Sequence, residues 1–258
     1  MVKEPGKSGS LWRLHYSVRQ PSLACDFFRL TGAKGRGTGE SLRQFPIREG
    51  DYLLADRGYS TATGIGYVAD ADGQVTVRMN TGSLRFQTSL DRPFRLLKKV
   101  STLQSPGDIG SWAVRIIAPR GVSVEGRVCA LRKTEEAIET AHRSLRLTAK
   151  RKGKKLQPQT LEFARYVILF TSFSAADFPV AEVLEWYRVR WQVELVFKRF
   201  KSLAALGHLP KRDDESAQAW LYGKLLVALL VERLIGYAMA VSPWGYPLAA
   251  PAAPQRLA

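Results

Sequence analysis

Residues 182–201 read EVLEWYRVRWQVELVFKRFK, a stretch long enough for one helix that carries two separate polar faces. At about 100° per residue, the first polar face is a narrow stripe of four residues, Tyr187, Arg190, Glu194 and Lys201. Apolar side chains flank this stripe, whereas Arg188, Gln192 and Arg199 form a second polar face that suits solvent. A carboxylate on a mostly buried helix is costly unless it is paired or binds a metal. The stripe therefore predicts either an internal ion-pair ladder or a ligand-binding face.

The spacing within the stripe by itself leaves both interpretations open. Arg190 and Glu194 stand four residues apart, which suits a salt bridge worth roughly 0.2–0.5 kcal/mol. The whole pattern, Y-x2-R-x3-E-x6-K in YRVRWQVELVFKRFK, resembles the Y-R-E-K signature of DDE-type bacterial insertion-sequence transposases of the IS-four family. The resemblance implies that Glu194 is the third metal-binding acid of an active site. It also implies that Tyr187, Arg190 and Lys201 meet DNA phosphates near the reacting end.

A second acidic motif lies in DYLLADRGYS, at 51–60. The apolar run 52–55 is typical of a short buried strand, and Asp56 ends it just before a turn at Gly58. An Asp at such a position often caps the backbone, but the end of a buried strand is also where an open α/β sheet places reactive groups. ADRGY resembles the second acidic motif of the same transposases, which implies that Asp56 binds metal together with Glu194.

The composition indicates what kind of partner the chain has. Its 258 residues carry a formal net charge of +16 and a pI near 10.1. This excess predicts a polyanionic partner, most directly nucleic acid, although a membrane surface or ribosomal contacts also suit a basic chain. Cys25, Cys129 and three scattered histidines indicate neither a disulfide framework nor a zinc site and fit a reducing cytoplasm. No stretch has the composition of a signal peptide or a membrane span.

Periodicity and turn residues predict an α/β chain whose middle part is rich in short strands. The predicted strands lie at 11–19, 23–31, 52–55, 74–79 and 163–170, and the predicted helices at 134–150, 182–201 and 216–235. Between them, short strand candidates recur in LRFQTSL, FRLLKKVSTL, SWAVRIIAP and VSVEGRVCALR. The resemblance implies an RNase H-like mixed sheet with flanking helices, interrupted by a β-rich insertion domain. The expected parts are a core at 1–79, the insertion at 80–165, the core resumed at 166–241, and an irregular tail at 242–258.

A basic run, RSLRLTAKRKGKK at 143–155, holds seven cations and no acid. Blocks of like charge often mark a solvated and mobile segment, so that interpretation stays open. Together with the two acidic motifs, the run predicts contacts with a DNA backbone. Lys150, Arg151 and Lys152 are the expected DNA-binding residues.

The resemblance implies two-metal phosphoryl transfer on double-stranded DNA, namely strand cleavage and strand transfer at insertion-sequence ends. Two Mg²⁺ ions are expected as cofactors, with Mn²⁺ as a substitute, and a homodimer is compatible. Only Asp56 and Glu194 match the three acids of the family, because the first Asp is expected on a strand before Leu11. We therefore expect an N-terminally truncated and inactive copy. A non-catalytic basic DNA-binding protein and a metal-dependent nuclease are the alternatives.

Overall fold

The computed structural model describes residues 2–3, 10–32, 37–202 and 214–240. The chain divides into two compact units, and each is described by itself. One unit is Glu40–Trp191, and the other combines Met1–Gly39 with Gln192–Ala258. The predicted irregular tail at 242–258 lies outside the described residues.

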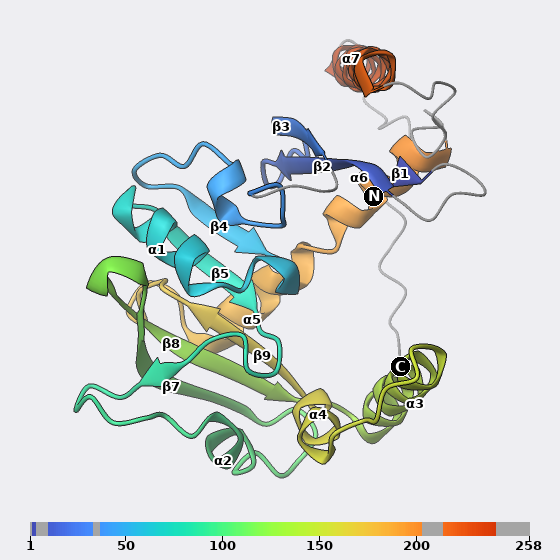
Figure 1. Cartoon of the computed structure of the whole chain (residues 1–258). Helices are drawn as coiled ribbons and strands as arrows, with labels where there is room; N and C mark the ends of the chain where they lie inside the picture. Colours follow the sequence, from blue (N-terminus) through green and yellow to red (C-terminus); the bar gives the residue numbers. More distant parts are fainter. Residues whose placement is uncertain (1, 4–9, 33–36, 203–213, 241–258) are drawn as a thin grey trace. The chain divides into compact units, whose positions relative to one another are not determined.

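A six-stranded mixed sheet forms the framework of Glu40–Trp191 (Figure 1). Its strand order is β4 (Tyr52–Ala55), β5 (Gln74–Arg78), β9 (Tyr166–Thr171), β8 (Ser123–Arg132), β7 (Ile109–Ile117) and β6 (Phe86–Gln87). β4 and β5 run parallel, and every other neighbouring pair is antiparallel. The carboxyl ends of β4, β5 and β8 therefore point to the same edge of the sheet, where β9 begins.

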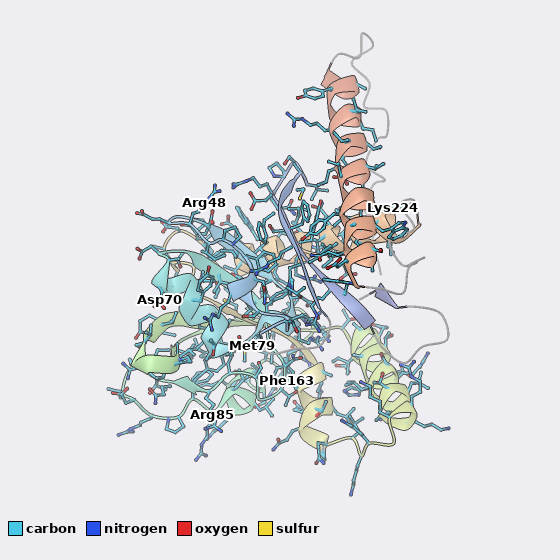
Figure 2. The ribbon with its side chains drawn as sticks, turned by 45° about the horizontal axis from the view of Figure 1, so that its top comes forward. Arg48, Asp70, Met79, Arg85, Phe163 and Lys224 are labelled. Atoms are coloured by element: carbon cyan, nitrogen blue, oxygen red, sulfur yellow. The ribbon has the colours of Figure 1, made fainter. Side chains whose placement is uncertain are left out.

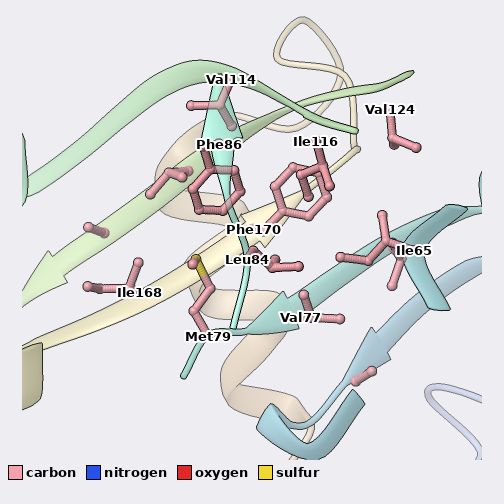
Figure 3. Close-up of a cluster of buried hydrophobic side chains, with 14 of the residues drawn as sticks. Ile65, Val77, Met79, Leu84, Phe86, Val114, Ile116, Val124, Ile168 and Phe170 are labelled. Atoms are coloured by element: carbon pink, nitrogen blue, oxygen red, sulfur yellow. The ribbon is translucent and has the colours of Figure 1, made fainter. Parts of the chain in front are cut away.

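Both faces of this sheet are covered by helices. The larger core, shown in Figure 3, packs α1 (Ala62–Asp70) and α2 (Leu96–Val100) against one face, and its central residues are Ile65, Val77 and Phe170. The opposite face carries Cys129 and Leu169, which pack with the side chains of α5 (Val180–Val189). Alternate residues of a strand point to opposite faces, so the apolar strands β8 and β9 contribute side chains to both cores. The predicted α/β class is confirmed.

A smaller core holds the other unit together. The strands β1 (Val2–Lys3), β2 (Ser10–Val18) and β3 (Cys25–Gly32) form an antiparallel sheet. The helices α6 (Gln192–Ser202) and α7 (Asp214–Ala240) pack with its side chains. The ring of Tyr16 meets those of Phe197 and Phe200 edge-on, with centroids 6.0 and 5.2 Å away. Aromatic pairs favour this arrangement.

The helix predicted over 182–201 is interrupted, which corrects the sequence interpretation. α5 ends at Val189 and α6 begins at Gln192. The amides of Arg190 and Trp191 donate to carbonyls only three residues back, at 3.2 and 3.5 Å, so the backbone tightens between the two helices. Angles around a single helix axis therefore do not relate Tyr187 to Glu194.

Two other expectations change in the middle of the chain. The strand predicted within FRLLKKVSTL is wrong, because Leu96–Val100 is the helix α2. Leu96, Val100 and Leu103 recur at helical rather than alternating spacing. The strand predicted at 163–170 starts later, at Tyr166, since α4 (Pro158–Ala164) occupies the residues before it.

The strands β7 and β8, predicted to belong to an insertion, share one sheet with β5 and β9. Whether 80–165 is an insertion stays a prediction.

The remaining elements are one long helix and three short turns. α3 (Glu135–Arg151) matches its prediction, and its N-cap Thr134 accepts a hydrogen bond from the amide of Ala137 at 3.3 Å. The 3₁₀ turns are η1 (Leu42–Gln44), η2 (Arg57–Tyr59) and η3 (Pro119–Gly121). Within the ranges that the structure describes, every helix is too short or too polar to cross a bilayer.

Candidate active site

Asp56 lies directly after β4 and is exposed. Its Oδ1 accepts a hydrogen bond from the amide of Arg57 at 2.7 Å, so the carboxylate caps η2. The capping role considered from sequence is therefore observed. One oxygen is enough for the cap, which leaves the second carboxylate oxygen for a ligand.

Arg78 is the neighbour of Asp56 on the adjacent parallel strand. Leu54 pairs with Thr76 and Ala55 with Val77, so one further step along both strands sets Asp56 beside Arg78. Parallel neighbours lie about 4.8 Å apart. The Arg78 side chain is half-buried, and burial, followed by the nearby charge of Arg57, lowers its pKa.

Lys133 reaches the same edge from β8. Its amide continues the strand pairing by donating to the carbonyl of Arg165 at 3.0 Å, and its Nζ donates to the carbonyl of Ala164, the last residue of α4, at 2.6 Å. The side chain is half-buried. Burial, and then the charges of Arg78 and Arg57, lower the pKa of Lys133 to about 8.

Tyr187 connects the signature segment to this edge. It is 6% exposed, and its hydroxyl donates to the carbonyl of Ala55, the last residue of β4, at 3.3 Å. Burial raises the pKa of Tyr187 to about 12, so the hydroxyl stays protonated at neutral pH. The guanidinium of Arg190, one turn later, lies 5.6 Å from the centre of the Tyr187 ring. Tyr187 thus fixes the end of α5 against the strand that carries Asp56.

Glu194 and Lys201 lie on α6, in the other compact unit. Glu194 is exposed in the first turn of this helix, and Lys201 is near its end. The approach of Glu194 to Asp56 stays a prediction. Among the residues described, no three of the types His, Cys, Asp and Glu gather in a metal-binding group. The two predicted carboxylates are nevertheless the hard oxygen ligands that suit Mg²⁺.

The basic end of α3 is a separate surface of the Glu40–Trp191 unit. Lys150 and Arg151 lie in its last turn and Lys152 is its C-cap, and all three side chains are exposed. Cations near a helix C-terminus interact favourably with the helix dipole. Figure 2 shows side chains projecting outward from α3, and elsewhere on this unit the labelled Arg48 and Arg85 also point outward. Arg143 is already engaged, in an ion pair with Glu139 at 3.6 Å.

Sequence reasoning missed three cations at the sheet edge where Asp56 lies, namely Arg57, Arg78 and Lys133. Arg57 was visible within the ADRGY motif as the residue after the acid. The other two carry no local signal, because Arg78 looks like an ordinary strand end and Lys133 like a loop residue. They reach the same sheet edge as Asp56 only through the pairing of β4, β5, β9 and β8.

Comparison with known proteins identifies the family of the chain. The family described as "Transposase DDE domain" matches residues 31–230. This span includes Asp56, the Y-R-E-K segment and the sheet that connects them. The mixed sheet with flanking helices is consistent with the RNase H-like fold of that family, as predicted.

Individual relatives come from bacterial insertion sequences. The InsL protein of insertion sequence element IS186A from Escherichia coli strain K12 is 30% identical over 91% of this chain and 64% of its own length. The transposase for insertion sequence element IS421 from Escherichia coli is 30% identical over 91% of this chain and 63% of its own length. The transposase for IS231C from Bacillus thuringiensis subsp. berliner is 28% identical over 40% of the chain and 22% of its own length. The chain thus spans less than two thirds of the length of these relatives. By the family match, which covers more than half of its residues, the chain belongs to the DDE transposase family, and its similarity to the IS186A and IS421 proteins supports the predicted IS-four family.

Proposed function

We propose that the chain acts on double-stranded DNA as the catalytic part of an insertion-sequence transposase, with strand cleavage and strand transfer as its reactions. The observation that carries this proposal is the hydrogen bond from Tyr187 to Ala55, which joins two motifs 132 positions apart in sequence. It brings the Tyr-Arg end of the signature segment to the strand end that presents Asp56. An internal ion-pair ladder would not require a contact between the signature segment and that strand end.

Asp56 and Glu194 are the proposed ligands of divalent metal. Mg²⁺ is commonly bound through one or two carboxylates together with substrate phosphates, so phosphate oxygens of the DNA complete the set. When bound, the metal ions activate the attacking oxygen and stabilise the leaving one. Asp56 contributes the carboxylate oxygen that its cap leaves available. Tyr187 holds the end of α5, whose next residues include Arg190, against the strand that ends before Asp56. Two Mg²⁺ ions, with Mn²⁺ as a substitute, remain the proposed cofactors.

DNA contacts are proposed at Arg190 and Lys201 near the reacting end and at the basic end of α3. Phosphate neutralisation by Lys and Arg releases counterions and dominates affinity for DNA. The buried hydroxyl of Tyr187 is bonded to protein, so we assign Tyr187 a positioning role beside its predicted DNA contact. A homodimer and a cytoplasmic location also remain part of the proposal.

We further propose that this chain by itself binds DNA better than it cleaves it. No third acid joins Asp56 within the described residues, and a site with fewer carboxylates holds its metals with less charge and poorer geometry. This behaviour would match the alternative of a non-catalytic DNA-binding protein derived from a transposase. A metal-dependent nuclease is the other alternative, and only strand transfer separates it from a transposase.

DNA binding is tested with a duplex carrying an insertion-sequence end, titrated from about 50 to 200 mM salt. Affinity should fall steeply as salt rises. Changing Lys150, Arg151 and Lys152 to Ala should reduce the slope of log affinity against log salt by about 2.7, or about 0.9 for each phosphate that is no longer neutralised. Changing the exposed cations Lys98 and Lys99 to Ala is the matched control. A flat response, or a triple variant no weaker than the control, contradicts the DNA-binding assignment of the α3 end.

Chemistry is tested with the same duplex and Mg²⁺ or Mn²⁺, following both cleavage and joining to a target. A version extended by an N-terminal strand bearing an Asp serves as the positive control. We expect slow cleavage by the chain itself, and loss of any cleavage in Asp56→Asn and in Glu194→Gln. Efficient cleavage that disappears in Glu194→Gln would refute the proposed inactivity but support the transposase. Cleavage that survives both substitutions would refute the metal site.

A further inference from the structure

We infer that Lys133 and Arg78 together bind a backbone phosphate of the DNA at the sheet edge where Asp56 lies. This inference rests on the proposed function, because it names two residues that would receive its substrate. Neither residue belongs to the acidic motifs or to the Y-R-E-K signature. Both lie in Glu40–Trp191, so the inference requires no placement of the other compact unit.

Strand pairing places both residues on the face that α5 covers. Arg78 pairs with Leu169, a member of the core beneath α5. Lys133 lies two residues beyond Leu131, which packs against the same core. Residues two apart in a strand share a face, and the amide of Lys133 still follows the pairing with β9. Both side chains therefore belong to the layer that contains Tyr187 and face the same edge as Asp56.

The cations at this sheet edge favour the binding of an anion. The positive charges of Arg57 and Arg78 act on Lys133. Those of Arg57 and Arg190 act on Arg78, where Asp56 and Tyr187 oppose them. Within the described ranges, neither Arg78 nor Lys133 forms an ion pair with a carboxylate. Like charges that are held together in a partly desolvated place raise the free energy of the empty site. A phosphate between them would offset this cost, and such arrangements concentrate at functional sites.

Arg132, the residue before Lys133, shows what a structural cation looks like in the same strand. It is 6% exposed, pairs with Glu135 at 2.9 Å and lies over the ring of Tyr166, on the opposite face of the sheet. Among the residues that the structure describes, Lys133 has one hydrogen-bond partner for its ammonium group, the carbonyl of Ala164, although an ammonium has three donors. It is also half-exposed, so a phosphate oxygen can reach its other donors.

The competing explanation is that Lys133 only caps α4 through Ala164. The two roles separate in a binding experiment on the full chain, using duplex DNA over a range of salt. For Lys133→Met we expect the slope of log affinity against log salt to fall by about 0.9 and affinity to weaken about tenfold. Lys133→Arg should keep the slope, because the charge remains. Lys99→Met, which removes an exposed cation from α2, is the control and should match the unmodified chain.

Three results decide between the explanations. A folded Lys133→Met variant that melts at a lower temperature but keeps the full salt slope overturns the inference in favour of the cap. If Lys133→Met does not fold, Arg78→Met in the same titration decides, and an unchanged slope overturns the inference.

The unmodified chain gives a further readout by acetylation and mass spectrometry. Duplex DNA should protect Lys133 and not Lys99, and equal labelling with and without DNA contradicts the site. An unmodified chain that binds no DNA instead refutes the proposed function.

Discussion

The two helices of the signature segment, α5 and α6, differ in what they pack against. Val183, Leu184 and Tyr187 of α5 pack on the sheet face that carries Cys129 and Leu169. Val196 and Phe200 of α6 pack instead with the hairpin of β2 and β3 and with α7. One amphipathic sequence thus serves two separate cores, and its four signature residues are divided between them. A continuous helical period in the sequence therefore does not imply that the whole segment forms one helix.

The largest expected effect is on the two cores. Phe170→Ala should destabilise the Glu40–Trp191 unit by about 3–5 kcal/mol, because a large buried ring is lost and a cavity is left. Phe200→Ala should do the same to the unit that contains α6. Hydrogen exchange should show faster opening of α5 and β9 in the first variant, and of α6 and α7 in the second. Equal acceleration of both helices by either variant would show that they unfold together.

Proline substitution probes the break at 190–191. Glu185→Pro lies in the middle of α5 and should cost about 3 kcal/mol, because proline removes a helical hydrogen bond and clashes with the preceding turn. Gln192→Pro lies at the first position of α6, where the amide has no helical partner, and should cost about 1 kcal/mol or less. Urea denaturation measures both. A similar cost at the two positions would favour a continuous helix.

The pH dependence of the free energy of unfolding should differ between the two units because of Lys133. Its pKa is lowered from 10.5 to about 8 in the folded chain, so between these values the unfolded chain binds more protons. The free energy of unfolding of Glu40–Trp191 should therefore rise from pH 8 to pH 10.5, by on the order of 2 kcal/mol. Denaturant titrations at several pH values, with Lys133→Met as the flat control, measure this rise. A fall in the free energy of unfolding over the same pH window would contradict the lowered pKa of Lys133.

The smallest expected effect concerns the bond that holds α5 to β4. Tyr187→Phe keeps the buried ring but removes the donor to the carbonyl of Ala55, and should cost about 1 kcal/mol. Phe197→Tyr, which leaves α5 untouched, is a control in the other unit. If Tyr187 positions Arg190, DNA affinity should also weaken in Tyr187→Phe. Unchanged stability and affinity would mean that packing alone holds α5 in place.

Local patterns predicted much of the fold. The apolar run at 52–55, the strand pattern at 74–79, the helix at 134–150 and the long apolar helix near 216–235 all correspond to observed elements. These features depend on residues within a strand or a few helical turns, so the sequence displays them directly. The expectation for FRLLKKVSTL was wrong because its leucines and valine were read as a strand, although their spacing suits a helix.

The candidate site was only partly predictable. Asp56 and the Y-R-E-K residues could be predicted as site residues because their motifs are short and local. Arg78 and Lys133 were missed because their position depends on β5 and β8 both pairing with β9, and hydroxyls that bond across β5 and β9 are 95 positions apart. No short window of sequence contains such a pairing.

The sequence by itself determined the family and the basic character of the chain, and it supplied the prediction of Asp56 and Glu194 as metal-binding acids, since residue type, spacing and net charge are properties of the unfolded chain as well. Tertiary structure alone decided that the signature segment divides at 190–191 and that Tyr187 is buried against Ala55. It also decided that Arg78 and Lys133 lie at the same sheet edge as Asp56. The physical reason is that each of these features depends on which distant segments share a core, and that choice is settled by long-range packing and strand pairing rather than by local preference.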